Sequence, residues 1–155
     1  LAHRSGVFGQ DGAGQARHAG YAQAMQARGL EQQHCWLQPA VEAGRAATAE
    51  LLNQHPADRP DALLASNGLL LLGAAQAIQS AGLQMPHDIG LAGFDNNDWT
   101  TLPALDVTVI EQPTYEIGRT AAELLLQRLA EPTRPVRSVV LEGRLLARGS
   151  TRRGG

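Results

Sequence analysis

The chain has 155 residues, enough for one domain or for one domain and part of a second, and 43% of its residues are hydrophobic. Its formal net charge of −2 does not predict the basic surface that duplex DNA requires, and its single cysteine, Cys35, excludes an internal disulfide. No apolar run reaches the roughly 20 residues of a membrane span, and the N-terminus lacks a secretory-signal pattern, so we expect a cytoplasmic protein.

The first third of the chain predicts two helices around a short strand. Leu1-Ala2-His3 is typical of the tail of a strand and indicates that the chain is a fragment, and residues 5–14, rich in glycine and polar groups, predict a loop. A helix is expected at about 13–28, where small residues recur at three- and four-residue spacing. A strand at 34–37 and a second helix at about 40–54 follow.

The middle of the chain continues this alternation. Residues 62–65 form a short, continuous apolar run, as expected of a strand covered on both faces. A helix is predicted at about 68–81, a buried strand at 89–94 and a polar loop at 95–106.

The last third predicts one more strand and one more helix before the chain end. A strand is expected at 107–110, and Pro113 is a favourable start for a helix that lasts to about 130. Residues 131–137 predict a linker, residues 138–146 a final strand, and residues 149–155 a frayed tail. Strands and helices that alternate at this spacing predict an α/β fold, with a parallel sheet flanked by helices on both faces.

Three predicted strands lead directly into a polar side chain. Asn67, Asp95 and Gln112 follow the strands in turn. Because ligands of parallel sheets bind at the carboxyl ends of the strands, these groups are suited to a polyhydroxylated small molecule. Trp99 could offer a flat apolar face to a sugar ring, or it could pack in the core. Helix capping and turn formation are the alternative roles for the polar residues.

The sequence shows no convincing catalytic or metal site. The five histidines lack metal-ligand spacing, and the adjacent His34-Cys35 pair lacks a third partner. The glycine-rich segment 9–14 precedes a helix but lacks the Lys-Ser/Thr of a P-loop and the G-x-G-x-x-G pattern, which favours a plain loop. We therefore predict no enzyme activity, no metal and no cofactor.

An ordered series of motifs carries a family resemblance over nearly the whole chain. Its members are Arg17-His18-Ala19-Gly20-Tyr21, Ser66-Asn67, Leu72-Gly73-Ala74, Gly82-Leu83, Pro86-His87-Asp88-Ile89, Gly93-Phe94-Asp95, Gln112-Pro113 with Gly118 and Ala121-Ala122, and Arg148-Gly149-Ser150-Thr151. In this series the chain resembles the C-terminal part of the effector-binding domain of LacI/GalR-type transcriptional repressors. The block from Ala65 to Pro113 is the most specific part of the match.

The resemblance implies a periplasmic-binding-protein-like (type I) lobe and a division of the chain. Residues 1–112 would form the C-terminal lobe of the effector-binding domain. Residues 113–141 would be a helix and strand of the N-terminal lobe, and residues 142–155 a return to the C-terminal lobe and tail. Operator DNA would be bound only through an N-terminal helix-turn-helix that this chain lacks.

The resemblance also implies the contacts to the effector. Arg17, Asn67 and Asp95 match the family's ligand-binding positions, and Gln112 matches a lesser one; Arg17 comes from the resemblance alone. Where the family usually has Asp after Ser-Asn, this chain has Gly68. The loop 95–99 is similar to that of members which respond to sugar acids such as gluconate or ketogluconate, and Arg17 could bind such a carboxylate through paired hydrogen bonds.

A homodimer is the expected assembly. The helix at 68–81 carries more apolar surface than one buried face needs, and the family dimerises partly through it, so Leu71, Leu72 and Ala75 are candidate interface residues. The alternative is a helix buried wholly within its own sheet. For the function, the alternatives are a periplasmic sugar-binding protein of a transport system and a doubly wound α/β enzyme.

Overall fold

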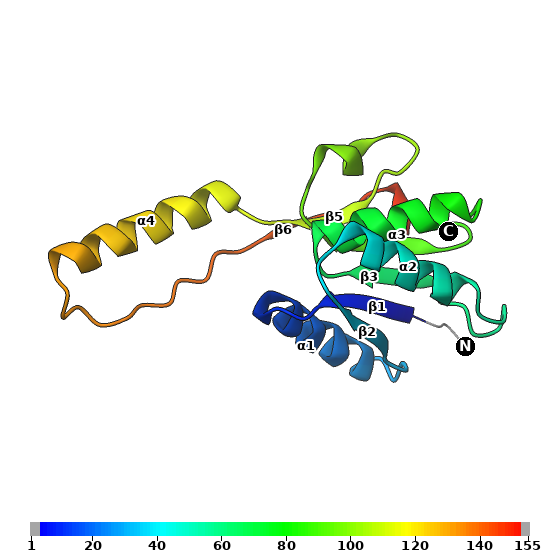
Figure 1. Ribbon diagram of the computed structural model, residues 1–155, viewed down its shortest axis with the longest axis horizontal. Coiled ribbons are helices and arrows are strands. Elements are labelled where there is room, and N and C mark those ends of the chain that lie inside the picture. Colours follow the sequence, from blue (N-terminus) through cyan, green and yellow to red (C-terminus); the bar gives the residue numbers. More distant parts are fainter. Residues whose placement is uncertain (1–3, 153–155) are drawn as a thin grey trace.

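The computed structural model describes residues 4–152 and contains one six-stranded sheet in the order β2-β1-β3-β4-β5-β6 (Figure 1). The first five strands pair in parallel, and the last is antiparallel to β5. The strands are β1 Arg4–Gly9, β2 Gln33–Leu37, β3 Ala62–Ala65, β4 Gly90–Phe94, β5 Thr108–Glu111 and β6 Arg144–Leu146. The helices are α1 Gly12–Gln26, α2 Val41–Leu52, α3 Gly68–Ser80 and α4 Thr114–Ala130, with short 3-10 helices η1 Asp98–Thr101 and η2 Gly149–Thr151. The predicted α/β class is confirmed.

Strand β1 corrects the prediction of a loop over residues 5–14. It pairs with β2 on one side and β3 on the other, so it lies inside the sheet. Its side chains alternate between the two faces, which places the fully buried Val7 and Phe8 in different clusters of the core. The sequence did not show this strand because its apolar run is only two residues long and is flanked by glycines, which usually mark a turn. The predicted strand tail at residues 1–3 lies outside the described residues.

Helices α2 and α3 cover one face of the sheet and pack closely on each other. A Cβ atom on Gly73 would lie 2.0 Å from the carbonyl oxygen of Val41, and one on Gly44 would lie 2.6 Å from that of Leu70. The two glycines therefore let the helix backbones approach one another directly. Beneath them, the side chains of Leu71 and Ile78 are fully buried against the sheet.

Helix α1 covers the opposite face at the β1–β2 edge, where it closes a smaller cluster of Phe8, Tyr21 and Met25. The carboxylate of Asp11 begins this helix, since its Oδ1 accepts a hydrogen bond of 2.6 Å from the backbone N–H of Gly14. The three layers, α1, sheet and α2/α3, form the folded body of the molecule (Figure 1).

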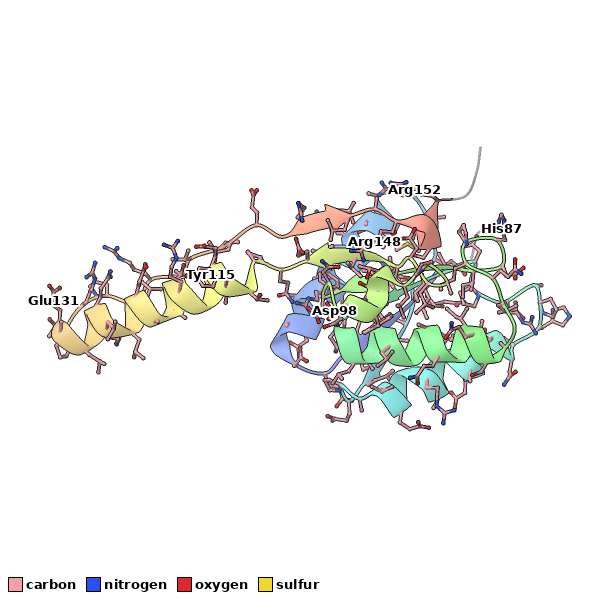
Figure 2. All side chains as sticks on the ribbon, turned by 90° about the horizontal axis from the view of Figure 1, so that it is seen from above. His87, Asp98, Tyr115, Glu131, Arg148 and Arg152 are labelled. Atoms are coloured by element: carbon pink, nitrogen blue, oxygen red, sulfur yellow. The ribbon has the colours of Figure 1, made fainter. Side chains whose placement is uncertain are left out.

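Helix α4 and residues 131–143, which return to the sheet, form an arm that extends away from this body (Figure 1). None of the residues described in α4 is buried. Figure 2 shows Tyr115 and Glu131 toward the two ends of the helix, and Leu126 and Leu129 are 66% and 68% exposed. The strand predicted at 138–146 is confirmed only over its last three residues. The earlier residues are part of the arm and run alongside α4, away from the sheet.

The predicted fraying of residues 149–155 is wrong for the described part of that segment. Ser150 is buried, its hydroxyl donates to the carbonyl of Leu91 at 2.5 Å, and it accepts from the N–H of Thr108 at 2.8 Å. These bonds hold the end of the chain against β4 and β5. Over residues 4–152, no helix is both long and apolar enough to cross a membrane.

Candidate ligand-binding site

The carboxyl ends of β3, β4 and β5 lie side by side, because these strands are neighbours in the sheet. Asn67, Asp95 and Gln112 follow these ends, as the sequence predicted. The side-chain amide of Gln112 donates to Oδ1 of Asp95, and the backbone N–H of Gly68, next to Asn67, donates to Oδ2 of Asp95 at 2.9 Å. The structure therefore brings the three positions together, with the Asp95 carboxylate in the centre.

Asp95 has an unusual backbone conformation for a residue with a side chain. Its φ is 75°, in the left-handed region that costs a non-glycine residue free energy. Aspartate tolerates this region better than most residues, and the two hydrogen bonds to its carboxylate hold it there. Backbone strain of this kind is common at functional sites.

Asn67 has the capping role that the sequence analysis gave as the alternative to ligand binding. It is the N-cap of α3, and its Oδ1 accepts a 3.0 Å hydrogen bond from the N–H of Leu70. Capping uses this oxygen, while the amide nitrogen faces Gly9, where a Cβ atom would lie 3.2 Å away. Asn67 also lines an open hollow beside the sheet.

The hollow at the start of α3 has a volume of about 790 Å³. Of the predicted site residues, Asn67, Asp95 and Trp99 line the hollow, whereas Arg17 and Gln112 do not. Trp99 also packs against the main core, so its two predicted roles are compatible. The sequence analysis missed the remaining lining residues, which are Asp11, Pro39, Gly68, Leu69, Leu72, Asn97 and Asp98.

Arg17 is half-buried and is held by contacts within the lobe. Its Nη1 donates to the carbonyl of Ser66 at 2.5 Å, and its guanidinium lies 4.2 Å from the ring centroid of Phe94. Ser66 and Phe94 immediately precede Asn67 and Asp95. The cation is therefore held beside the same strand ends as the polar groups.

The structure gives a steric reason for a glycine at position 68. A Cβ atom there would lie 2.7 Å from Nδ2 of Asn97 and 3.2 Å from Oδ2 of Asp95. Asp95 and Asn97 thus occupy the space that a side chain at position 68 would need. Gly68, where the family usually has Asp, thus lies against a tightly packed loop. The carboxylate of Asp95 accepts the hydrogen bond from the first N–H of α3.

The geometry gives little support to the alternatives of a phosphate site, a cysteine nucleophile or a metal site. Asp11 places a carboxylate at the N-terminus of α1, where a phosphate would need free N–H groups. Of the predicted loop, only residues 10 and 11 lie outside a strand or helix. Burial, followed by the charge of Glu50, raises the pKa of the Cys35 thiol, which disfavours the thiolate that a nucleophile needs. Within residues 4–152, no three or more His, Cys, Asp or Glu side chains are grouped as metal ligands.

Two of the three predicted interface residues lie inside the lobe. Leu71 and Ala75 are 0% and 1% exposed, because they face the sheet and the core, and they leave no surface for a second subunit. Their assignment is corrected. The surplus apolar surface of α3 belongs instead to Leu69, which is 49% exposed, and to the half-buried Leu72.

Comparisons with known proteins agree with this fold. Residues 3–151 match the family described as periplasmic binding protein-like domain. The chain is 36% identical over 104 residues to the HTH-type transcriptional regulator KdgR of Bacillus subtilis (strain 168), covering 66% of this chain and 31% of that protein. This relative is named as a transcriptional regulator, in agreement with the family resemblance of the sequence.

Two solved structures carry sugars. The complex of transcriptional regulator CelR with cellobiose is similar with a TM-score of 0.87 and 31% identity, over 96% of this chain and 46% of that one. A LacI family regulator from Arthrobacter sp. FB24 in complex with lactose is similar with a TM-score of 0.79 and 25% identity, over 97% and 58%. The chain spans only about a third to just over half the length of these proteins. It belongs to the family of periplasmic binding protein-like domains and is part of the effector-binding domain of a LacI-family regulator.

Proposed function

We propose that this chain binds a sugar or sugar acid in a cytoplasmic LacI/GalR-type repressor, whose operator DNA is bound by a helix-turn-helix outside the chain. The observation that carries the proposal is the Asp95 carboxylate, held in a strained conformation at the edge of the sheet beside Asn67 and Gln112. A carboxylate and two amides can bind vicinal hydroxyl groups. The cellobiose and lactose complexes of similar proteins support a carbohydrate.

The arm supports a division into two lobes. The body up to Gln112 would be the C-terminal lobe, and residues 113–141 would belong to an N-terminal lobe completed by other residues of the protein. The exposed leucines of α4 favour this division, because an apolar helix face needs a cover. Ligand bound between the lobes would favour one relative orientation and so alter how paired DNA-binding heads fit their operator.

Gluconate or ketogluconate is the proposed effector class. Arg17 lies beside the site and is always charged, and a guanidinium can bind a carboxylate through two parallel hydrogen bonds. Binding of a carboxylate would require Arg17 to exchange its bond to Ser66 for one to the ligand, or to keep it and use its remaining donors.

Calorimetric titration of the full-length protein with gluconate, 2-ketogluconate, glucose and cellobiose tests both levels of the proposal. We expect binding of at least one compound, weakened about 10- to 100-fold by Asp95→Asn, since a hydrogen bond to a charged group contributes about 1.5–3 kcal/mol. Asp58→Asn, which changes an exposed carboxylate in the loop before β3, is the control.

The sugar-acid assignment has its own test. Arg17→Lys should weaken the binding of gluconate more than that of glucose, because lysine keeps the charge but loses the paired geometry. A preference of the unaltered protein for neutral sugars would contradict this assignment and leave the broader proposal in place. If none of the four compounds binds, the broader proposal fails.

A further inference from the structure

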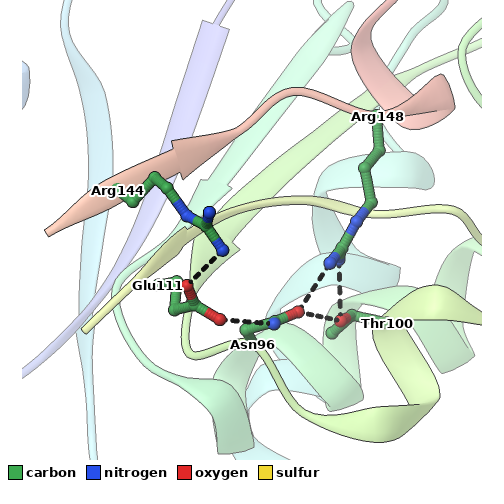
Figure 3. Close-up of polar contacts among 5 residues, drawn as sticks. All are labelled: Asn96, Thr100, Glu111, Arg144 and Arg148. Carbon is green, nitrogen blue, oxygen red and sulfur yellow. Dashed lines mark hydrogen bonds and ion pairs between the residues drawn. The ribbon is translucent and has the colours of Figure 1, made fainter. Parts of the chain in front are cut away.

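A chain of polar side chains joins the loop that carries Asp95 to the place where the arm leaves the body (Figure 3). Its members come from three separate segments: the loop after β4, the end of β5, and the segment from β6 to η2. We call Asn96, Glu111, Arg144 and Arg148 the relay. Within the described residues, the relay lies outside the lining of the hollow.

Asn96 is the centre of the relay. Its Nδ2 donates to Oε1 of Glu111 at 2.8 Å, and its Oδ1 accepts from Nη2 of Arg148 at 2.6 Å. The hydroxyl of Thr100, in η1, lies 3.4 Å from the same oxygen and donates its short hydrogen bond, of 2.6 Å, to the carbonyl of Asn97. Because Asn96 directly follows Asp95 along the chain, a fixed Asn96 side chain restricts how the strained Asp95 backbone can turn.

Arg148 is the fixed end of the relay. Its Nη1 donates to the hydroxyl of Thr100 and to the carbonyl of Val107, both at 2.9 Å. Its backbone N–H donates to the hydroxyl of Thr108 at 2.9 Å, so the residue is held by main chain and side chain alike. One guanidinium thus ties η1 and the start of β5 to the C-terminal segment.

Glu111 and Arg144 form the end of the relay that lies next to the arm. Glu111 is the last residue of β5 and Arg144 the first of β6, and they are partners in the antiparallel register. Nη2 of Arg144 lies 2.9 Å from Oε2 of Glu111. The chain leaves the sheet after β5 to form the arm and returns at β6 (Figure 1). A change in the direction of the arm must therefore act on this pair.

We propose that the relay couples the direction of the arm to the conformation of the Asp95 loop, with Asn96 as a positioning residue for the ligand site. The coupling runs from the Arg144–Glu111 pair through the Asn96 side chain to the backbone at Asp95. The consequence for ligand binding rests on the proposed function, whereas the mechanical coupling does not.

Energetic considerations agree with a local rather than a global role. The Arg144 side chain is 73% exposed, and exposed ion pairs contribute little to overall stability. The hydrogen bonds to Glu111 from Asn96 and then from Arg144 hold the pKa of this carboxyl below its ordinary value, so the charge on which the relay depends is present at neutral pH. Loss of one member should release the loop without unfolding the lobe.

Hydrogen exchange measured by mass spectrometry on the full-length protein tests the coupling without a ligand. We expect the peptide that covers residues 95–101 to exchange about fivefold faster in both Glu111→Ala and Arg144→Ala, a change at the lower end of typical site-to-site coupling. Peptides from α2 and α3 should be unchanged. Arg119→Ala, which removes an exposed ion pair with Glu116 on α4, is the matched control.

The possible outcomes separate the two proposals. Unchanged exchange of residues 95–101 in Glu111→Ala overturns the relay, and so does faster exchange spread over the whole sheet with a lower melting temperature, which indicates only a structural role. If exchange rises locally, calorimetry with gluconate should show weaker binding in the same variants. A protein that binds none of the tested sugars refutes the proposed function, while the exchange result still decides the relay.

Discussion

The side-chain amide of Gln112 donates a hydrogen bond to Oδ1 of Asp95, and this contact joins the ends of β5 and β4 at the edge of the sheet. It uses one carboxylate oxygen of Asp95, while the N–H of Gly68 uses the other. A residue with a strained backbone is thus held from two neighbouring strand ends at once.

Removal of the Gln112 amide should loosen this arrangement. In Gln112→Leu, the side-chain volume is retained but Oδ1 of Asp95 loses its donor. We expect the free energy of unfolding to fall by about 1 kcal/mol, since the site is only partly buried and water can replace the amide. Urea denaturation measures this change. Gln127→Leu on the exposed arm is the control, and an equal loss there would contradict the assignment.

Gly73 should be the least tolerant glycine of α3. Alanine there would place its Cβ atom 2.0 Å from the carbonyl oxygen of Val41, so α2 and α3 must separate. We expect Gly73→Ala to destabilise the protein by about 1–3 kcal/mol. Gly20→Ala, on the exposed side of α1 with no atom within 4 Å of the new Cβ, should instead stabilise by about 0.5–1 kcal/mol. Thermal unfolding of both variants compares them, and equal effects would refute the proposed packing.

The imidazole of His18 predicts a pH dependence of stability. Burial, and then the charge of His34 with its ring centroid 4.1 Å away, lower the pKa of His18 from its ordinary value of 6.5. Its Nε2 is buried without a hydrogen-bond partner among the described residues. The unfolded chain therefore binds the proton more readily than the folded one, and the protein should lose stability as the pH falls below 6.5.

Urea denaturation between about pH 5 and pH 8, the range over which histidine titrates, measures this dependence. His18→Asn should reduce its slope, whereas His55→Gln, at an exposed position, should leave the slope unchanged. A slope that is the same in both variants would show that other groups cause it.

Leu72 is the one predicted interface residue that keeps an accessible surface. If α3 contributes to a two-fold interface, Leu72→Arg should shift the mass in solution toward the monomer, because a charge would be buried between apolar surfaces. Light scattering after size-exclusion chromatography measures this. Gln79→Arg, exposed on the same helix, is the control, and an unchanged dimer in Leu72→Arg would exclude this part of α3 from the interface.

The α/β class and most element positions follow from the local sequence pattern. Buried runs such as residues 62–65 and 90–94 show as continuous apolar segments, and the helices show through the spacing of their small and apolar residues. The pattern failed at β1, where the apolar run is only Val7-Phe8 between glycine and polar residues. It also failed at residues 138–143, which are as apolar as a strand but pair with no strand of the described residues.

The strand-end residues could be predicted because a parallel sheet brings all its carboxyl ends to one edge, whatever the tertiary details. Only the tertiary structure decided how these residues are held: the left-handed backbone of Asp95, the capping bond of Asn67 and the seat of Arg17 between Ser66 and Phe94. It also decided that Leu71 and Ala75 are core residues and that Arg148 reaches the loop after β4. Such contacts join residues far apart in the chain, so periodicity and local propensity, which act over a few neighbouring residues, carry no record of them.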